Sequence, residues 1–241
     1  MSFFFVLVLG LIAGTISGIV GFGSSIMLMP VLVIVFGPLQ AVPIMAVAAL
    51  MANFSRIVVW YREVDWKACA AYSITGVPCA ALGARTLLAL PPRVIDVTLG
   101  AFFILMIPTR RWLNAHGLRL RLWHLAIVGA VIGFLTGIVV STGPINVPFF
   151  LAYGLVKGAF LATEAAGSLA IYGAKAAIFR NFGALPLEAI VQGLIIGCSL
   201  MIGSFIAKPF VLRLPPERFR LLMDAMLLLS GATMLWAAVG A

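Results

Sequence analysis

Two stretches of this chain combine glycine with hydroxyl side chains in strongly apolar surroundings. One reads GTISGIVGFGSS over residues 14–25, and the other reads STGPIN over residues 141–146. The backbone N–H groups at the start of a helix, together with small residues and hydroxyl donors, are suited to bind a small anion. The candidate donors are Gly21, Gly23, Ser24, Ser25, Ser141, Thr142, Gly143 and Asn146.

Glycine in such a stretch also has a purely structural use. Gly14, Gly18 and Gly21 recur at helical spacing, and small residues on one helix face let a neighbouring helix approach closely. For these three glycines we favour packing as the explanation. For residues 23–25 and 142–144 we hold binding and packing as equal alternatives.

Two cations, Arg56 and Lys175, lie inside apolar segments. A charge within a membrane span is costly and therefore indicates function, which here would be anion binding. Because each lies only a few residues from the end of its expected helix, the alternative is that the charge reaches the membrane interface. Asn53 and Tyr172 lie one turn before them on the same helix face and would add polar groups to a binding site.

Carboxylates and other reactive groups are scarce in the apolar segments. Asp224 lies deep in an expected span and could carry a proton for coupling, although pairing with Arg220 one turn earlier is favoured. We expect Glu164, which is nearer to a span end, at the membrane interface. Neither histidine lies in a span and no metalloprotease or nucleotide-binding motif occurs, so we expect no enzyme, no metal and no cofactor.

The composition around these residues is typical of a membrane protein. The 241 residues are 63% hydrophobic and 10% charged, whereas about a quarter of a soluble domain is charged. Apolar runs of roughly 20 residues alternate with short clusters containing Arg, Pro or Gly. The net charge of +9 resides mainly in these clusters, where it orients a membrane protein, so we expect no nucleic-acid partner.

The two halves of the chain resemble each other. GLIAGTISGIV at residues 10–20 matches GAVIGFLTGIV at residues 129–139, and the same offset of 119 places Arg56 on Lys175. Such self-similarity indicates an internal duplication. We therefore expect one membrane domain that contains a first repeat at 1–115, a basic cytoplasmic link at 116–121 and a second repeat at 122–241.

Each repeat begins with an apolar segment that is too long for one crossing. Residues 3–36 would form a helix of about 50 Å, whereas the hydrocarbon core is roughly 30 Å thick. We expect a break at residues 21–25, where a serine caps the new helix, and another at residues 141–146, where Pro144 suits the first turn. Three ordinary spans would follow each break, at 41–61, 67–89 and 93–113, then at 160–180, 187–210 and 217–239.

Each broken segment could continue across the membrane or turn back as a re-entrant hairpin. If it continues, the repeats are parallel and the basic residues outside the spans divide seven against seven. If it turns back, the repeats are inverted and the division is eleven against three. Because Lys and Arg accumulate on the cytoplasmic side, we expect an all-α polytopic fold of two inverted repeats with both termini outside the cytoplasm.

The chain also resembles a known family. GTISGIVGFGSS and GFLTGIVVSTGP, followed by NFSRIVVWYREVDW and SLAIYGAKAAIFRNFGAL, are similar to the TauE/SafE family of sulfite and sulfonate exporters. The resemblance covers essentially the whole chain and implies a multi-pass permease of the bacterial inner membrane that moves sulfite or an organosulfonate. Family members often have a run of glycines after the first Gly-x-Gly, where this chain has Ser24 and Ser25.

Together these features predict a secondary transporter whose anion site lies between two hairpin tips near the membrane midplane. The expected partners are a small anionic sulfur compound and the lipid bilayer, and the sequence leaves a homo-oligomer open. The alternatives are an anion channel and an accessory membrane subunit that transports nothing alone.

Overall fold

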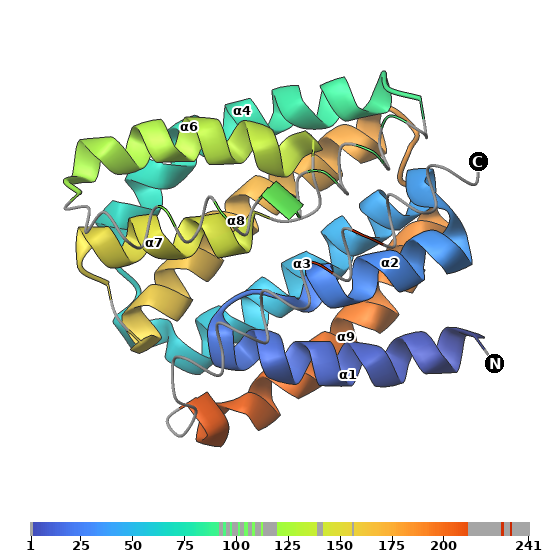
Figure 1. Ribbon diagram of the computed structural model, residues 1–241, viewed down its shortest axis with the longest axis horizontal. Coiled ribbons are helices and arrows are strands. Elements are labelled where there is room, and N and C mark those ends of the chain that lie inside the picture. The colour runs from blue at the N-terminus through green and yellow to red at the C-terminus, as the bar shows by residue number, and fades with distance from the viewer. Residues whose placement is uncertain are drawn as a thin grey trace.

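In the computed structural model, the described part of the chain is built of α-helices (Figure 1). The structure describes residues 2–91, 120–138, 142–155 and 157–211, with a few single positions between 94 and 112 and at 228 and 232. This part of the chain contains no β-strand. The helices are α1 Ser2–Val20, α2 Ser24–Phe36, α3 Pro38–Trp60, α4 Trp66–Leu88, α6 Leu122–Ile138, α7 Gly143–Tyr153, α8 Lys157–Asn181 and α9 Leu187–Val211, with a 3-10 turn at Tyr61–Glu63.

Both expected helix breaks occur. The first separates α1 from α2 after Val20, and the second separates α6 from α7 after Ile138. Pro144 lies in the first turn of α7, as predicted. After each break the second helix runs back along the direction from which the first came (Figure 1). The chain therefore turns back at both breaks.

Four of the six ordinary spans agree closely with helices of the structure. α3, α4, α8 and α9 match the spans expected at 41–61, 67–89, 160–180 and 187–210. The carboxylate of Asp65 caps α4, because it accepts hydrogen bonds from the N–H groups of Lys67 and Ala68 at 3.0 Å each. The spans expected at 93–113 and 217–239 and most of the link at 116–121 lie outside the described residues, apart from single positions.

Glycine-rich faces bring two pairs of helices into backbone contact. α6 packs on α4, and α1 packs on α9. A Cβ atom added at Gly133 would lie 2.7 Å from the Cα of Gly76, and one added at Gly14 would lie 2.7 Å from the Cα of Leu200. Atoms of neighbouring helices do not approach so closely, so these positions require glycine. The packing role predicted for Gly14 and Gly18 is confirmed.

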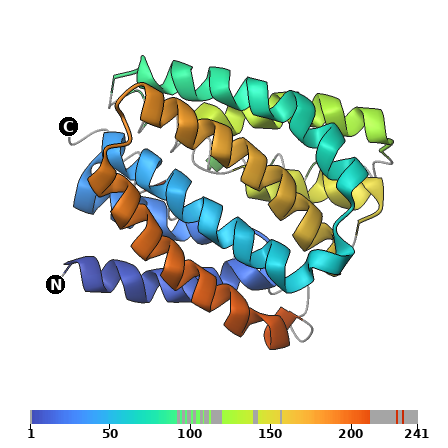
Figure 2. The same cartoon turned by 180° about the vertical axis from the view of Figure 1, so that it is seen from behind.

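The longer helices lie side by side behind the hairpins. Figure 2 shows α4, α8, α3 and α9 in this order, and adjacent members of this row are in contact. α2 packs on α3 and α7 packs on α8, so the second helix of each hairpin rests on a central helix of its own half. The start of each of these short helices is thereby placed at the centre of the molecule, next to α3 and α8.

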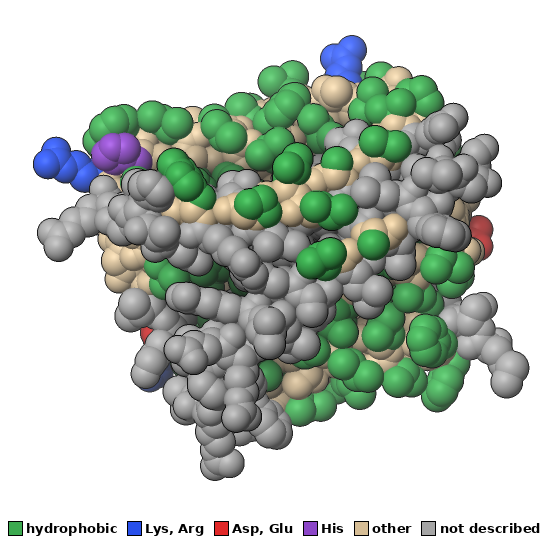
Figure 3. Space-filling view, viewed as in Figure 1, with side chains coloured by type: hydrophobic (Ala, Val, Ile, Leu, Met, Phe, Trp, Pro, Cys, Tyr) green, Lys and Arg blue, Asp and Glu red, His purple; other side chains and the backbone are tan. Residues whose placement is uncertain are grey.

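The outer surface of the described part is apolar. Large side chains on the outer helices, such as Phe4, Ile34, Ile74 and Leu187, are each more than half exposed. Among the side chains that Figure 3 colours on one face, most are apolar, and the charged ones lie towards the margins. By length and composition, the described segments Leu39–Glu63 and Leu187–Ala207 could cross a membrane. A surface of this kind is suited to contact with lipid.

Candidate functional site

The connection between α1 and α2 is a tip of three residues, 21–23. Gly21 and Gly23 adopt φ angles of 90° and 111°, which residues with a side chain rarely adopt. Gly21 therefore belongs to the tip rather than to α1, and it also lies close to α8, because an added Cβ would lie 2.8 Å from Cδ2 of Leu161. The predicted serine cap is wrong, because Gly23 precedes α2 without a side-chain cap and Ser24 is the first helical residue.

The second tip lies at the start of α7. The hydroxyl of Thr142, the residue before this helix, lies 2.6 Å from the hydroxyl of Thr136 in the last turn of α6. Thr142 and Asn146, one turn into α7, are both buried. Ser141 lies outside the described residues. A buried pair of hydroxyl groups thus holds the start of α7 against the end of α6.

Both tips line one small cavity with about 20 Å³ of free space, which is room for a water molecule. Because α2 and α7 both begin here, the positive ends of two helix dipoles meet at the cavity. Ten predicted site residues belong to its lining, namely Gly21, Gly23, Ser24, Ser25, Asn53, Arg56, Thr142, Gly143, Asn146 and Tyr172. The described lining also includes residues that we did not predict, namely Ser17, Phe22, Ala49, Ala52, Thr136, Glu164 and Ser168.

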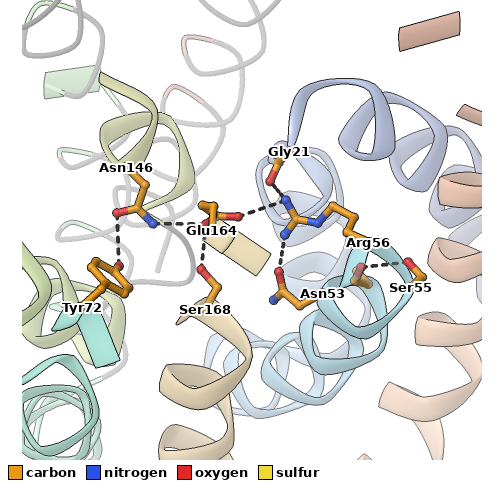
Figure 4. Close-up of polar contacts among 9 residues, drawn as sticks. Gly21, Asn53, Ser55, Arg56, Tyr72, Asn146, Glu164 and Ser168 are labelled. Carbon is orange, nitrogen blue, oxygen red and sulfur yellow. Dashed lines mark hydrogen bonds and ion pairs between the residues drawn. The ribbon is translucent and has the colours of Figure 1, made fainter. Parts of the chain in front are cut away.

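Arg56 brings a buried positive charge from α3 to this cavity (Figure 4). Its Nη1 donates to the backbone oxygen of Gly21 and, at 3.1 Å, to Oε2 of Glu164. Its Nη2 donates to Oδ1 of Asn53, one turn earlier on α3. Nε has no hydrogen-bond partner within the described part of the chain. The guanidinium is enclosed by protein groups, so the alternative in which it reaches the membrane interface does not apply.

Lys175, the equivalent of Arg56 in the second half, is also buried. Its Nζ donates to the backbone oxygen of Thr136 at 2.7 Å and lies 5.6 Å from the ring centre of Phe179. Each of the two cations therefore binds a carbonyl oxygen at the end of the first helix of its own half, where the helix dipole is negative. Arg56 lines the cavity, whereas Lys175 is not among its described lining residues.

Glu164 is buried in the centre of the site, so its predicted position at the membrane interface is wrong. Its Oε1 accepts hydrogen bonds from the hydroxyl of Ser168 at 2.7 Å and from Nδ2 of Asn146 at 3.2 Å. The hydroxyl of Tyr72 in turn donates to Oδ1 of Asn146 at 3.2 Å. These contacts and the ion pair with Arg56 connect α3, α4, α7 and α8 in one polar network (Figure 4).

A sequence pattern could have identified Glu164. Glu164, Ser168, Tyr172 and Lys175 follow one another at intervals of three or four residues, so they share one face of α8. Distance from the end of the expected span is a poor guide here, since α8 begins earlier than predicted, at Lys157. A line of polar groups along an apolar helix indicates a protein-lined site rather than an interface.

The charges of this arrangement favour an anion. Arg56 balances the charge of Glu164, and Lys175 adds a second buried amine beside the site. Two helix N-termini and several hydroxyl groups add partial positive charge and hydrogen-bond donors. Asp224, the residue predicted for proton coupling, lies outside the described residues, so that role stays a prediction.

A protein-family model matches almost the whole chain. The model describes the sulfite exporter TauE/SafE and matches residues 6–234. This match confirms the resemblance found in the sequence. No curated protein and no solved structure matches the chain.

Proposed function

This chain belongs to the TauE/SafE sulfite exporter family, and we propose that it is a secondary transporter of sulfite or an organosulfonate. Membership places it among membrane permeases of sulfur-containing anions, and the described part has helices able to span a membrane. We further propose that it works in the bacterial inner membrane, that it is not an enzyme, and that its substrate binds between the two hairpin tips.

The observation that carries the proposal is that both tips and Arg56 converge on one buried cavity. The first tip contributes Ser24 and Ser25, whose side chains do not cap α2. The second tip contributes Thr142 and the start of α7. An anion placed here would be bound by donors from both halves of the chain, so its binding would couple the two hairpins.

Arg56 can offer an unused side of its guanidinium group to such an anion. The guanidinium has five N–H donors, and the structure shows three hydrogen bonds from its two terminal nitrogens. The unpartnered Nε and the remaining N–H of Nη2 are left for a ligand. Two parallel N–H groups can bind two oxygens of one oxyanion, and sulfite and sulfonates both present such oxygens.

The size of the cavity favours a carrier over an open channel. Its free space of about 20 Å³ is of the size that a single water molecule needs. We therefore expect the tips to separate when an anion enters. Because α2 and α7 are only about 20 Å and 16 Å long, each ends inside a hydrocarbon core of roughly 30 Å. These lengths support our proposal that the site lies near the membrane midplane, where alternating access is gated in transporters built from inverted repeats.

Contacts at one end of the helices support inverted repeats. The N–H of Leu120 donates to the oxygen of Ala152 at 2.9 Å, and the N–H of Asp65 donates to the hydroxyl of Thr163 at 2.9 Å. The end of α3 therefore lies on the same side as the start of α6 and the end of α7. When these three helix ends share one side of the membrane, the basic residues outside the spans divide eleven against three. We propose that this end faces the cytoplasm.

Cysteine labelling of intact cells tests the proposed orientation. The three natural cysteines Cys69, Cys79 and Cys198 are first replaced, and Arg62→Cys and Arg85→Cys are then made separately. Both arginines are exposed but lie at opposite ends of the helices. We expect a membrane-impermeant maleimide to label Arg85→Cys from outside, and to label Arg62→Cys only after the cells are opened. Labelling of Arg62→Cys in intact cells would show that the orientation is reversed.

Uptake by purified protein in liposomes tests the proposed function. We expect saturable uptake of sulfite or of a sulfonate such as isethionate, sulfoacetate or taurine, and competition between the substrates for one site. Inorganic sulfate serves as a comparison that differs in charge and shape. Absence of saturable uptake for every compound would contradict the proposal. A flux that rises linearly with concentration would favour the anion channel.

A further inference from the structure

The ion pair of Arg56 with Glu164 breaks the symmetry between the two halves of the chain. The offset of 119 that pairs Arg56 with Lys175 pairs Glu164 with Met45, a buried apolar residue. Burying two charges is costly, and such a pair is weak evidence for a purely stabilising role. The carboxylate also lines the same cavity as the guanidinium. Its position therefore calls for a functional explanation.

The two oxygens of Glu164 have different surroundings. Two neutral donors, the hydroxyl of Ser168 and the amide of Asn146, converge on Oε1. Arg56 is the one donor to Oε2 within the described part of the chain. A protonated carboxyl group also has one accepting oxygen and one O–H oxygen. Oε1 can therefore keep its two hydrogen bonds while Oε2 loses its contact with Arg56 and binds a proton instead.

We propose that binding of the substrate anion to the free side of Arg56 draws the guanidinium away from Oε2 of Glu164, and that Glu164 takes up one proton when the anion binds. This inference rests on the proposed transport function and names the group that couples it. A buried carboxylate that loses its cation is strongly disfavoured, and neutralisation by a proton removes that cost. The anion and the proton therefore bind together, and release of the anion lets Arg56 pair with Glu164 again.

The proton comes from water on the side from which the anion enters and is returned to water on the other side. No covalent bond other than the O–H of Glu164 forms or breaks. Within the described part of the chain, the ionisable groups that face Glu164 are Arg56 from α3, Tyr72 from α4 and Tyr172 from its own helix. None of these is an acid that could replace Glu164 as the carrier at neutral pH.

The charge of the site changes in the direction that an anion requires. With Glu164 ionised, the pair of Arg56 and Glu164 carries no net charge, and protonation of Glu164 leaves the pair with one positive charge. The bound anion is then held by the full charge of Arg56. For an anion with one negative charge, co-transport with one proton carries no net charge across the membrane.

Proton counting in liposomes tests this inference on the wild-type protein. We use isethionate, a sulfonate whose single negative charge does not change over the pH range of the assay. An inward isethionate gradient without a pH gradient should acidify the lumen by one proton for each anion taken up. The rate should not change when a potassium diffusion potential is imposed with valinomycin.

Binding measurements on two variants assign the proton to Glu164. The affinity of the wild type for isethionate should rise about tenfold for each unit by which the pH falls, since one proton is bound per anion. Glu164→Gln cannot take up that proton, so its affinity should not vary with pH. Glu188→Gln changes an exposed carboxylate at the start of α9 and should keep the wild-type pH dependence.

Three results would overturn the inference or its premise, and they can be told apart. Saturable isethionate uptake without lumen acidification would overturn proton coupling and leave the transporter intact. A wild-type pH dependence in Glu164→Gln would show that another group carries the proton. No saturable uptake of either isethionate or sulfite would contradict the proposed function itself. If Glu164→Gln fails to fold, the proton count of the wild type still decides whether a proton is coupled.

Discussion

Arg56→Gln is expected to reduce sulfite uptake by more than about a hundredfold, to the level of empty liposomes. The guanidinium supplies the positive charge of the cavity and the two N–H groups that remain for a ligand. Hydrogen bonds to a charged group contribute roughly 1.5–3 kcal/mol each, so the loss of two exceeds a hundredfold in affinity. Initial uptake rates by the purified variant in liposomes measure the effect. Arg62→Gln, which removes an exposed arginine from the 3-10 turn that follows α3, should transport like the wild type.

A double variant separates this loss from misfolding. Arg56→Gln leaves Glu164 buried without its cation, which should lower the free energy of unfolding by about 3–5 kcal/mol. Arg56→Gln combined with Glu164→Gln removes both charges and should recover most of that stability, while uptake stays abolished. Thermal unfolding in detergent and uptake would be measured on the same preparations. Transport by the double variant would show that Arg56 acts on the fold rather than on the anion.

Gly133→Ala is expected to disrupt the packing of α6 on α4. The added Cβ would lie 2.7 Å from the Cα of Gly76, and neither backbone can move without separating the two helices. Overpacking a well-packed contact typically lowers the free energy of unfolding by about 1–3 kcal/mol. Because backbone atoms cannot move aside as side chains can, we expect a loss of about 3 kcal/mol or more here. We expect a clear fall in the unfolding temperature and a smaller yield of monodisperse protein.

Gly173→Ala is the matched control for this change. Gly173 lies inside α8, and an added Cβ would meet no described atom within 4 Å. Alanine favours the helix over glycine by up to about 1 kcal/mol, so this variant should be as stable as the wild type or slightly more stable. Equal stabilities of the two variants would show that the close contact between α6 and α4 is not required.

Much of the helical organisation follows from the sequence because it depends on local properties. A straight helix of the 34 apolar residues 3–36 would be longer than the hydrocarbon core is thick, so the helix has to break. Glycine and serine residues mark the place of the break. The ends of the expected spans 67–89 and 187–210 lie within one residue of the ends of α4 and α9. The length of an apolar segment sets the length of a helix in a membrane. The positive character of the buried site can also be inferred, because Arg56 and Lys175 stand inside apolar segments.

The tertiary structure alone decided which of these groups meet. Glu164 and Arg56 are 108 residues apart, and only the contact of α3 with α8 joins them in one ion pair. The same packing gives the equivalent cations Arg56 and Lys175 different places, one in the cavity lining and one outside the described lining. Composition and spacing report on single helices and on their length. Which faces of two distant helices come together depends on the contacts of every other helix in the bundle, as the glycine faces of α1 and α6 illustrate.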